Sequence, residues 1–200
     1  MKILPAQLRG FQDAAEIIRQ DGIVAYPTET VYGLAVDPFS GAALERLLDA
    51  KGRDASKGIL LIVADSNQLE RVARDIPDEA LSLIEAFWPG PLTLLFPATA
   101  EVPDVLLGPS GKVAVRCPGH AAARELCAVF GGPLTSTSAN RSGAPPATCA
   151  EAIDLPGVGA VLNGGMLPSA QPSTLADPET GTILREGAID RQTLAPFLKG

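Results

Sequence analysis

The hydrophobic and polar positions of the chain follow two different periodicities. From Phe11 to Gln20 apolar residues recur at helical spacing, and Gly22 to Tyr26 then forms a continuous apolar run that predicts a buried strand. Gly41 to Lys51 carries leucines on one helical face, and Gly58 to Val63 is a second apolar run, typical of a strand covered on both faces. Helices and strands therefore alternate in the first third of the chain, which favours an α/β fold.

The rest of the chain continues this alternation and then changes. Further helices are predicted over residues 65–74, 77–87, 120–130, 148–153 and 190–198. Further strands are predicted over residues 92–96, 112–116, 134–138 and 159–162, with a hairpin joining 173–177 to 182–185. Because hairpin-like pairs appear late, we expect a twisted mixed parallel/antiparallel sheet flanked by helices. No repeat or linker interrupts the chain, so we expect one domain over residues 1–200.

Composition narrows the classes of function. The formal net charge of −7 disfavours broad non-specific binding of nucleic acids, which needs an excess of Lys and Arg on one face. No apolar run approaches the roughly 18 residues that a membrane span requires. The 3 cysteines are odd in number and lack Cys-x-x-Cys spacing, so neither a disulfide framework nor a zinc site is predicted. We therefore expect a cytoplasmic protein with reduced thiols and no membrane association.

The common signatures of nucleotide binding and covalent catalysis are not met. Gly108 to Lys112 ends in Gly-Lys, but the first glycine of a phosphate-binding loop is missing and Val113 stands where Ser or Thr is needed. Residues 157–159 contain two glycines without the third of a dinucleotide fingerprint. His120 is the one candidate base for a Ser-His-Asp triad, and its position at the start of a predicted helix favours a structural role. We nominate no nucleophile, no acid/base residue and no protein metal ligand.

One short segment concentrates polar groups directly after a predicted strand: Pro27-Thr-Glu-Thr-Val-Tyr-Gly-Leu34. Pro27 has no N–H for a sheet ladder, so the strand should end there. Two threonines, a carboxylate and a phenol follow before Gly33, which permits a tight backbone turn. Loops beyond strand ends often bind ligands in α/β proteins. These residues alone leave two interpretations open, a turn with satisfied hydroxyls or one wall of a binding site.

Cations and hydroxyl groups gather at the ends of several predicted elements. They are Lys51, Arg53, Lys57, Lys112, Arg116, Arg141 and Arg185, together with the hydroxyl-rich segment 135–140. Each has a structural alternative, since a cation at a helix end stabilises the helix by about 0.3–1 kcal/mol and an arginine is usually a surface charge. Their joint placement at strand ends, in a protein that is acidic as a whole, instead favours a pocket for phosphate or carboxylate groups.

Seven segments then occur in one order along the chain. They are residues 27–34, residues 50–53 leading to 57–61, residues 88–93, 113–116 and 136–140, Ser173-Thr174 with Asp177, and residues 184–187. On these segments the chain resembles the YrdC family, the threonylcarbamoyl-AMP synthases of tRNA modification. Because the chain ends soon after Gly187, the resemblance implies the short single-domain form of a YrdC-like fold.

The resemblance implies a nucleotidyltransferase that joins L-threonine, bicarbonate or CO2, and ATP into L-threonylcarbamoyladenylate and pyrophosphate. A downstream complex would transfer the threonylcarbamoyl group to tRNA, with direct tRNA contact by this chain left open. The implied threonine-binding residues are Thr28, Arg116, Ser136 and Ser173. The implied ATP-binding residues are Lys51, Arg53, Lys57, Ser138, Asn140 and Arg185. Mg2+ would arrive with ATP, and Lys51 and Arg53 would contribute alignment and charge stabilisation rather than acid/base chemistry.

Two positions depart from the family pattern, and two alternatives stay open. Asp54 stands where the family commonly has proline, and Ala64 stands where some longer relatives have a histidine near threonine. A non-catalytic RNA-binding module could use the same basic concavity, although the acidic balance counts against it. A different adenylating or carbamoylating enzyme could use the same pocket for another amine.

Overall fold

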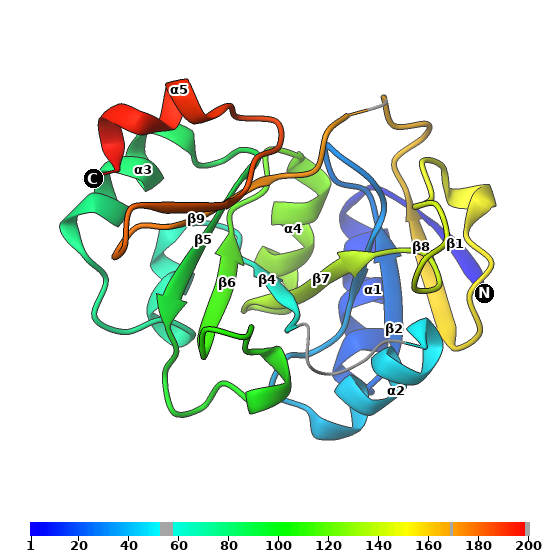
Figure 1. Cartoon of the computed structure of the whole chain (residues 1–200). Helices are drawn as coiled ribbons and strands as arrows, with labels where there is room; N and C mark the ends of the chain where they lie inside the picture. Colours follow the sequence, from blue (N-terminus) through cyan, green and yellow to red (C-terminus); the bar gives the residue numbers. More distant parts are fainter. Residues whose placement is uncertain (53–57, 169, 199–200) are drawn as a thin grey trace.

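The computed structural model describes residues 1–52, 58–168 and 170–198, and their strands form one mixed sheet (Figure 1). The order across the sheet is β1 (Lys2–Pro5), β8 (Val158–Asn163), β2 (Ile23–Tyr26), β3 (Gly33–Ala35), β7 (Leu134–Ser138), β4 (Leu60–Ile62), β6 (Lys112–Arg116), β5 (Leu92–Pro97), β9 (Thr174–Asp177) and β10 (Thr182–Arg185). β8 pairs in parallel with β1 and β2, as does β4 with β6 and β5 with β9. The other neighbours are antiparallel, which confirms the predicted mixed sheet.

Helices cover both faces of this sheet. On one face α1 (Leu8–Arg19) and α4 (Ala121–Phe130) lie side by side (Figure 1) and share an apolar cluster with Leu4, Val24 and Leu162. On the other face α2 (Gly41–Lys51) and α3 (Asp78–Phe87) contribute to a second, larger core. Within the described ranges, no helix is long and apolar enough to cross a membrane.

The helix α2 has clear signals at both of its ends. Ser40 precedes it, and the Ser40 hydroxyl accepts the backbone N–H of Ala43, which satisfies one of the free donors of the first turn. Gly52 follows it with a φ of 55°, the left-handed conformation that glycine adopts without a Cβ penalty. The sequence therefore ends the helix at Lys51 and turns the chain there.

Several elements of the structure differ in type or length from those predicted from the sequence. Residues 65–74 and 148–153 were expected as α-helices, but they contain only the 3-10 turns η2 (Ser66–Arg71) and η4 (Ala150–Ala152). The expected terminal helix is a short α5 (Arg191–Leu194) followed by the 3-10 turn η5 (Ala195–Phe197), and another 3-10 turn, η3 (Asp104–Leu106), precedes β6. Strands β1 and β3 were not expected, because segments of 4 and 3 residues are too short to display a periodicity.

The face that carries α4 extends beyond this helix into an uncovered area. Side chains two residues apart on a strand point to the same face. On β4 and β7, Ile62 and Leu134 belong to the core cluster of α4, whereas Leu60 and Ser136 line a cavity. The cavity is therefore the part of one sheet face that α1 and α4 leave open.

Candidate functional site

The open face forms a cavity of about 830 Å³. Residues of β3, β4, β5, β6, β7, β9 and β10 line it, so its walls come from segments far apart in the sequence. It brings together six of the predicted site residues: Thr28, Arg116, Ser136, Ser138, Ser173 and Arg185. The neighbouring wall is apolar, with Leu95 and Leu175 among its side chains. A ligand with anionic ends and an apolar part fits such a lining.

Thr28 lies in a tight turn directly after β2. Its hydroxyl donates to the carbonyl oxygen of Val31 at 2.6 Å and accepts the N–H groups of Thr30 and Val31 at 3.1 and 3.2 Å. The Thr30 hydroxyl lies 3.0 Å from the same oxygen. Thr28 thus combines the two interpretations of this segment, because it stabilises the turn while the turn forms a wall of the cavity.

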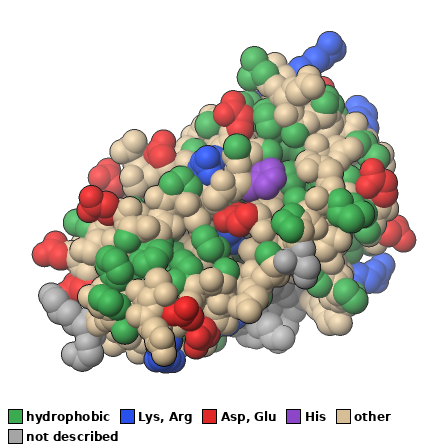
Figure 2. Space-filling view, turned by 90° about the horizontal axis from the view of Figure 1, so that it is seen from above, with side chains coloured by type: hydrophobic (Ala, Val, Ile, Leu, Met, Phe, Trp, Pro, Cys, Tyr) green, Lys and Arg blue, Asp and Glu red, His purple; other side chains and the backbone are tan. Residues whose placement is uncertain are grey.

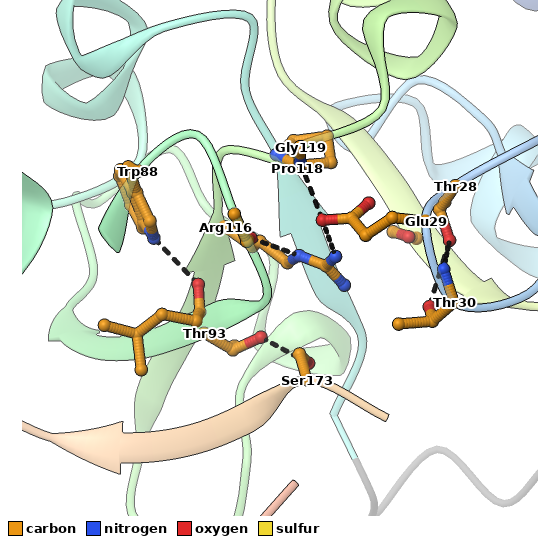
Figure 3. A network of polar contacts seen from close by, with 12 residues as sticks. Thr28, Glu29, Thr30, Trp88, Thr93, Arg116, Pro118, Gly119 and Ser173 are labelled. Carbon is orange, nitrogen blue, oxygen red and sulfur yellow. Dashed lines mark hydrogen bonds and ion pairs between the residues drawn. The ribbon is translucent and has the colours of Figure 1, made fainter. Parts of the chain in front are cut away.

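Arg116, the last residue of β6, is 4% exposed and is fixed from two sides (Figure 3). Its Nε donates to the carbonyl oxygen of Gly90 at 2.9 Å, and its Nη2 forms an ion pair with Glu29 Oε1. The same carboxylate oxygen accepts the N–H of Gly119 at 2.7 Å. Burial would raise the pKa of Glu29, but the guanidinium and the hydrogen bonds outweigh it and hold the pKa below its ordinary value. Glu29 is therefore ionised at neutral pH and neutralises Arg116.

Glu29 is a site residue that the sequence analysis did not assign. The signal was present, since Glu29 is the only carboxylate in the segment 27–34. Its partner, however, lies 87 positions later in the sequence, and no local pattern connects the two.

Arg185 ends β10 on the opposite side of the cavity and has a different environment. Its guanidinium donates to the carbonyl oxygen of Ser173 at 3.1 and 2.8 Å and to the Ser173 hydroxyl at 3.2 Å. Among the described residues, no carboxylate pairs with it. Partial burial, and then the positive charge of Arg116, lower the pKa of Arg185. Within the described residues, Arg185 therefore faces the cavity without a counter-charge, and a bound anion would supply one.

Two pairs of hydroxyl groups link serines of the cavity lining to side chains on other strands. Ser173 is 4% exposed, and its hydroxyl lies 2.8 Å from that of Thr93 on β5 (Figure 3). On the other side, the Tyr26 hydroxyl donates to the Ser136 hydroxyl at 2.6 Å. The hydroxyl groups of Ser136 and Ser173 are therefore each held by a neighbouring side chain.

Lys51 is buried and is not among the residues that line the cavity. The side chain is 3% exposed, and its ammonium group donates to the carbonyl oxygens of Ser138 and Asn140, the latter at 2.9 Å. Asn140 donates through Nδ2 to the carbonyl oxygen of Ala144, while its Oδ1 is buried and has no hydrogen-bond partner among the described residues. Lys51 thus positions the loop after β7. The predicted ATP-binding residues Arg53 and Lys57 lie outside the described residues.

Two further groups of interest have structural partners. Lys112 pairs with Asp177 and Glu179, each at 2.7 Å, so carboxylates balance its charge. His120 precedes α4, and its Nδ1 accepts the N–H of Ala122 at 3.2 Å, which confirms its expected structural position at a helix start. In the part of the chain that the structure describes, no group of three or more His, Cys, Asp or Glu could hold a metal ion.

Charged side chains are dispersed on the surface that Figure 2 displays. Acidic and basic groups occur both along the outline and near the centre, and the basic groups stand singly (Figure 2). On this face, the described residues form no continuous basic stripe of the kind that follows a nucleic-acid backbone.

Known proteins are similar to this chain in both sequence and fold. A family model of Sua5, YciO and YrdC proteins, described as "Telomere recombination", matches residues 16–187. A threonylcarbamoyl-AMP synthase of Coxiella burnetii is 39% identical over 180 residues, which cover 88% of this chain and 97% of that protein. A threonylcarbamoyl-AMP synthase of Nitrosococcus oceani is 43% identical over 180 residues, covering 86% of this chain and 95% of that protein.

Two solved structures have similar folds. P. abyssi Sua5 complexed with L-threonine has a TM-score of 0.92 and 35% sequence identity, and the match covers 98% of this chain but only 61% of that chain. E. coli YciO has a TM-score of 0.81 and 25% identity, covering 96% of this chain and 97% of that chain. The seven segments of the sequence analysis are thus embedded in a shared fold.

Proposed function

The chain belongs to the family of Sua5, YciO and YrdC proteins, and we propose that it acts as a threonylcarbamoyl-AMP synthase. Its substrates are L-threonine, bicarbonate or CO2, and ATP. The threonine amine bonds to the carbon of CO2 and loses a proton, which gives a carbamate. A carbamate oxygen then attacks the α-phosphorus of ATP, and the bond between the α-phosphorus and the bridging oxygen breaks. The products are L-threonylcarbamoyladenylate and pyrophosphate.

One observation carries this proposal: the two arginines of the cavity differ in their charge balance. Arg116 is neutralised by Glu29, whereas Arg185 has only neutral acceptors among the described residues. Threonine is a zwitterion without net charge, and ATP is a polyanion. A balanced pair suits the amino acid, because an excess positive charge would repel its ammonium group. An uncompensated cation suits the phosphates.

The threonine end accordingly comprises Thr28, Arg116, Ser136 and Ser173. The guanidinium of Arg116 and the serine hydroxyls offer donors to the substrate carboxylate, and the turn of Thr28 closes the adjacent wall. Glu29 joins this group through its contact with Arg116. These groups align the amine, and no side-chain nucleophile takes part.

The ATP end comprises Ser138, Asn140 and Arg185, with Lys51 holding the loop that carries Ser138 and Asn140. Arg53 and Lys57 extend this end, as the family resemblance implies. The two ends meet where Arg185 contacts Ser173, so the carbamate and the α-phosphate would approach each other there. Catalysis then consists of alignment and of stabilising the charge that develops on the phosphate oxygens.

Mg2+ enters with ATP as part of the substrate. In this proposal the ion is held mainly by phosphate oxygens and water. In that position it neutralises part of the triphosphate charge.

The reactivity of the product indicates that a second enzyme must act soon after this one. A mixed anhydride of a carbamic acid and a phosphate hydrolyses readily in water, so an enzyme that transfers the threonylcarbamoyl group to tRNA must consume it promptly. We assign the reaction to the cytoplasm, where ATP and tRNA are both available, and a binding assay with tRNA tests whether this chain contacts it directly.

A pyrophosphate-release assay tests the function. Purified protein is mixed with ATP, Mg2+, L-threonine and bicarbonate, and each component is then omitted in turn. Release that requires both threonine and bicarbonate is the expected result. Release with another amine in place of threonine would indicate a different adenylating enzyme. No release under any condition, together with retained RNA binding, would overturn the proposal.

A further inference from the structure

The side chain of Tyr26 crosses one strand to reach the next. Tyr26 on β2 pairs with Gly33 on β3, and β7 follows on the far side of β3. A Cβ atom at Gly33 would lie 3.0 Å from both Cζ and the hydroxyl oxygen of Tyr26, closer than ordinary contact allows. The missing side chain of Gly33 therefore gives the phenol its route across β3 to Ser136 on β7.

The hydrogen bond at the end of this route has one direction. Tyr26 is fully buried, and burial raises its pKa far above the ordinary value, so the phenol keeps its proton at all physiological pH values. Its hydroxyl donates to the Ser136 hydroxyl at 2.6 Å. Ser136 thereby uses a lone pair as acceptor, and its own hydrogen needs another acceptor.

Within the described residues, no protein group accepts that hydrogen. Ser136 forms no other side-chain hydrogen bond there, although it is only partly buried and lines the cavity. A free serine hydroxyl can rotate between donor and acceptor roles. With Tyr26 donating to it, the Ser136 oxygen has one lone pair occupied and its hydrogen must point away from the phenol, and the cavity offers the open direction.

We propose that Tyr26 is a positioning residue that fixes the Ser136 hydroxyl as a hydrogen-bond donor to the carboxylate of bound threonine. A carboxylate only accepts hydrogen bonds, so a serine locked as donor matches it, whereas a freely rotating one pays orientational entropy on binding. The inference rests on the proposed function and adds to it a residue that never touches the substrate. It also explains why a phenol and a glycine stand at positions 26 and 33.

A double-mutant cycle tests the coupling between the two hydroxyls. The variants are Tyr26→Phe, which keeps the ring and removes only the oxygen, Ser136→Ala, and the two combined. Tyr26→Phe should raise the KM for threonine by about fivefold to tenfold, the effect of one hydrogen bond. The KM for ATP and the melting temperature should change little. In the Ser136→Ala background the same change should alter the threonine KM less than about twofold, because its target is gone.

The other tyrosine provides a matched control. The Tyr32 hydroxyl donates to the carbonyl oxygen of Gly165 at 2.9 Å and accepts the N–H of Gly164 at 3.0 Å, so it does not act through Ser136. Whatever Tyr32→Phe does to the threonine KM, it should do equally with and without Ser136→Ala.

The possible outcomes separate the two proposals. If Tyr26→Phe has the same effect in both backgrounds, or raises the KM for ATP as much as that for threonine, the positioning role is wrong while the synthase remains. If a folded Tyr26→Phe variant binds threonine as the wild type does, the role is also wrong. A wild-type protein without threonine-dependent pyrophosphate release would overturn the proposed function and this inference with it. Should Tyr26→Phe not fold, Gly33→Ala displaces the phenol instead, and an unchanged threonine KM in that variant would overturn the role.

Discussion

Arg116 and Arg185 face the same cavity and are held in opposite ways. Arg116 is buried at the end of a central strand, with a carbonyl oxygen on one side and the Glu29 carboxylate on the other. Arg185 lies at the end of the edge strand β10, is partly exposed, and within the described residues forms side-chain hydrogen bonds to Ser173 alone. The contacts of Arg116 therefore contribute to the stability of the fold, whereas those of Arg185 contribute little to it. The difference indicates that substitutions at the two positions will separate stability from ligand binding.

The largest effect is expected for Arg116→Ala. The change removes the guanidinium and leaves the Glu29 carboxylate without its counter-charge, so unfolding should require about 3 kcal/mol less free energy. The kcat/KM for threonine should fall by about 100-fold, as expected for a lost charged donor. Urea denaturation and pyrophosphate release measure the two effects. Adding Glu29→Ala should recover part of the stability but none of the threonine binding, and an unchanged threonine KM would contradict the assignment.

A smaller and more selective effect is expected for Arg185→Ala. Because this side chain is partly exposed and, among the described residues, hydrogen-bonds to Ser173 alone, the free energy of unfolding should change by less than about 0.5 kcal/mol. The KM for ATP should rise about 10-fold to 100-fold, and Arg185→Lys should retain part of the affinity. Titration with ATP at constant threonine measures this change. A loss of threonine binding with intact ATP binding would reverse the proposed division of the cavity.

The smallest effect concerns pH and the Glu29 carboxyl. Its pKa is lowered in the folded state, so its contribution to stability is present above the ordinary value of 4.5 and is lost as the pH falls through the lower folded-state value. Below about pH 4.5, wild-type stability should therefore fall more steeply than that of Glu29→Gln. Asp190, whose pKa is also lowered, titrates in both proteins and cancels in the comparison. Parallel curves of unfolding free energy against pH would show that the ion pair contributes nothing.

The sequence predicted the elements whose patterns are local and long enough to read. The apolar run at Ile23 and the leucines of α2 lie where the periodicity places them, and α2 has the predicted bounds because Ser40 and Gly52 cap it. Strand β3 was not predicted, because its three residues, which include Gly33, are too few to show an alternation of apolar and polar positions. Residues 65–74 looked helical because apolar spacing does not distinguish an α-helix from a 3-10 turn.

The site was predictable as a set of residues but not as a set of contacts. Motifs pointed to Arg116 and Ser136, and the structure brings both to one cavity. The partners that orient them, Glu29 and Tyr26, depend on strand order, since each acts on a residue far away in the sequence. Tertiary adjacency of this kind has no local signal. The same holds for Lys51, whose buried ammonium group donates to the carbonyl oxygens of Ser138 and Asn140, residues far away in the sequence.

The alternation along β6 has a consequence for the fidelity of folding. Ala114 and Arg116 point into the cavity, while Val113 and Val115 point into the core. A slip of this strand by one residue would exchange the two sets, burying the guanidinium among apolar side chains and filling the site with valines. A chain with that error would be both unstable and unable to bind substrate. The binding surface and the native register are therefore specified by the same residues, so a misregistered chain would be a target for degradation rather than a weakly active enzyme.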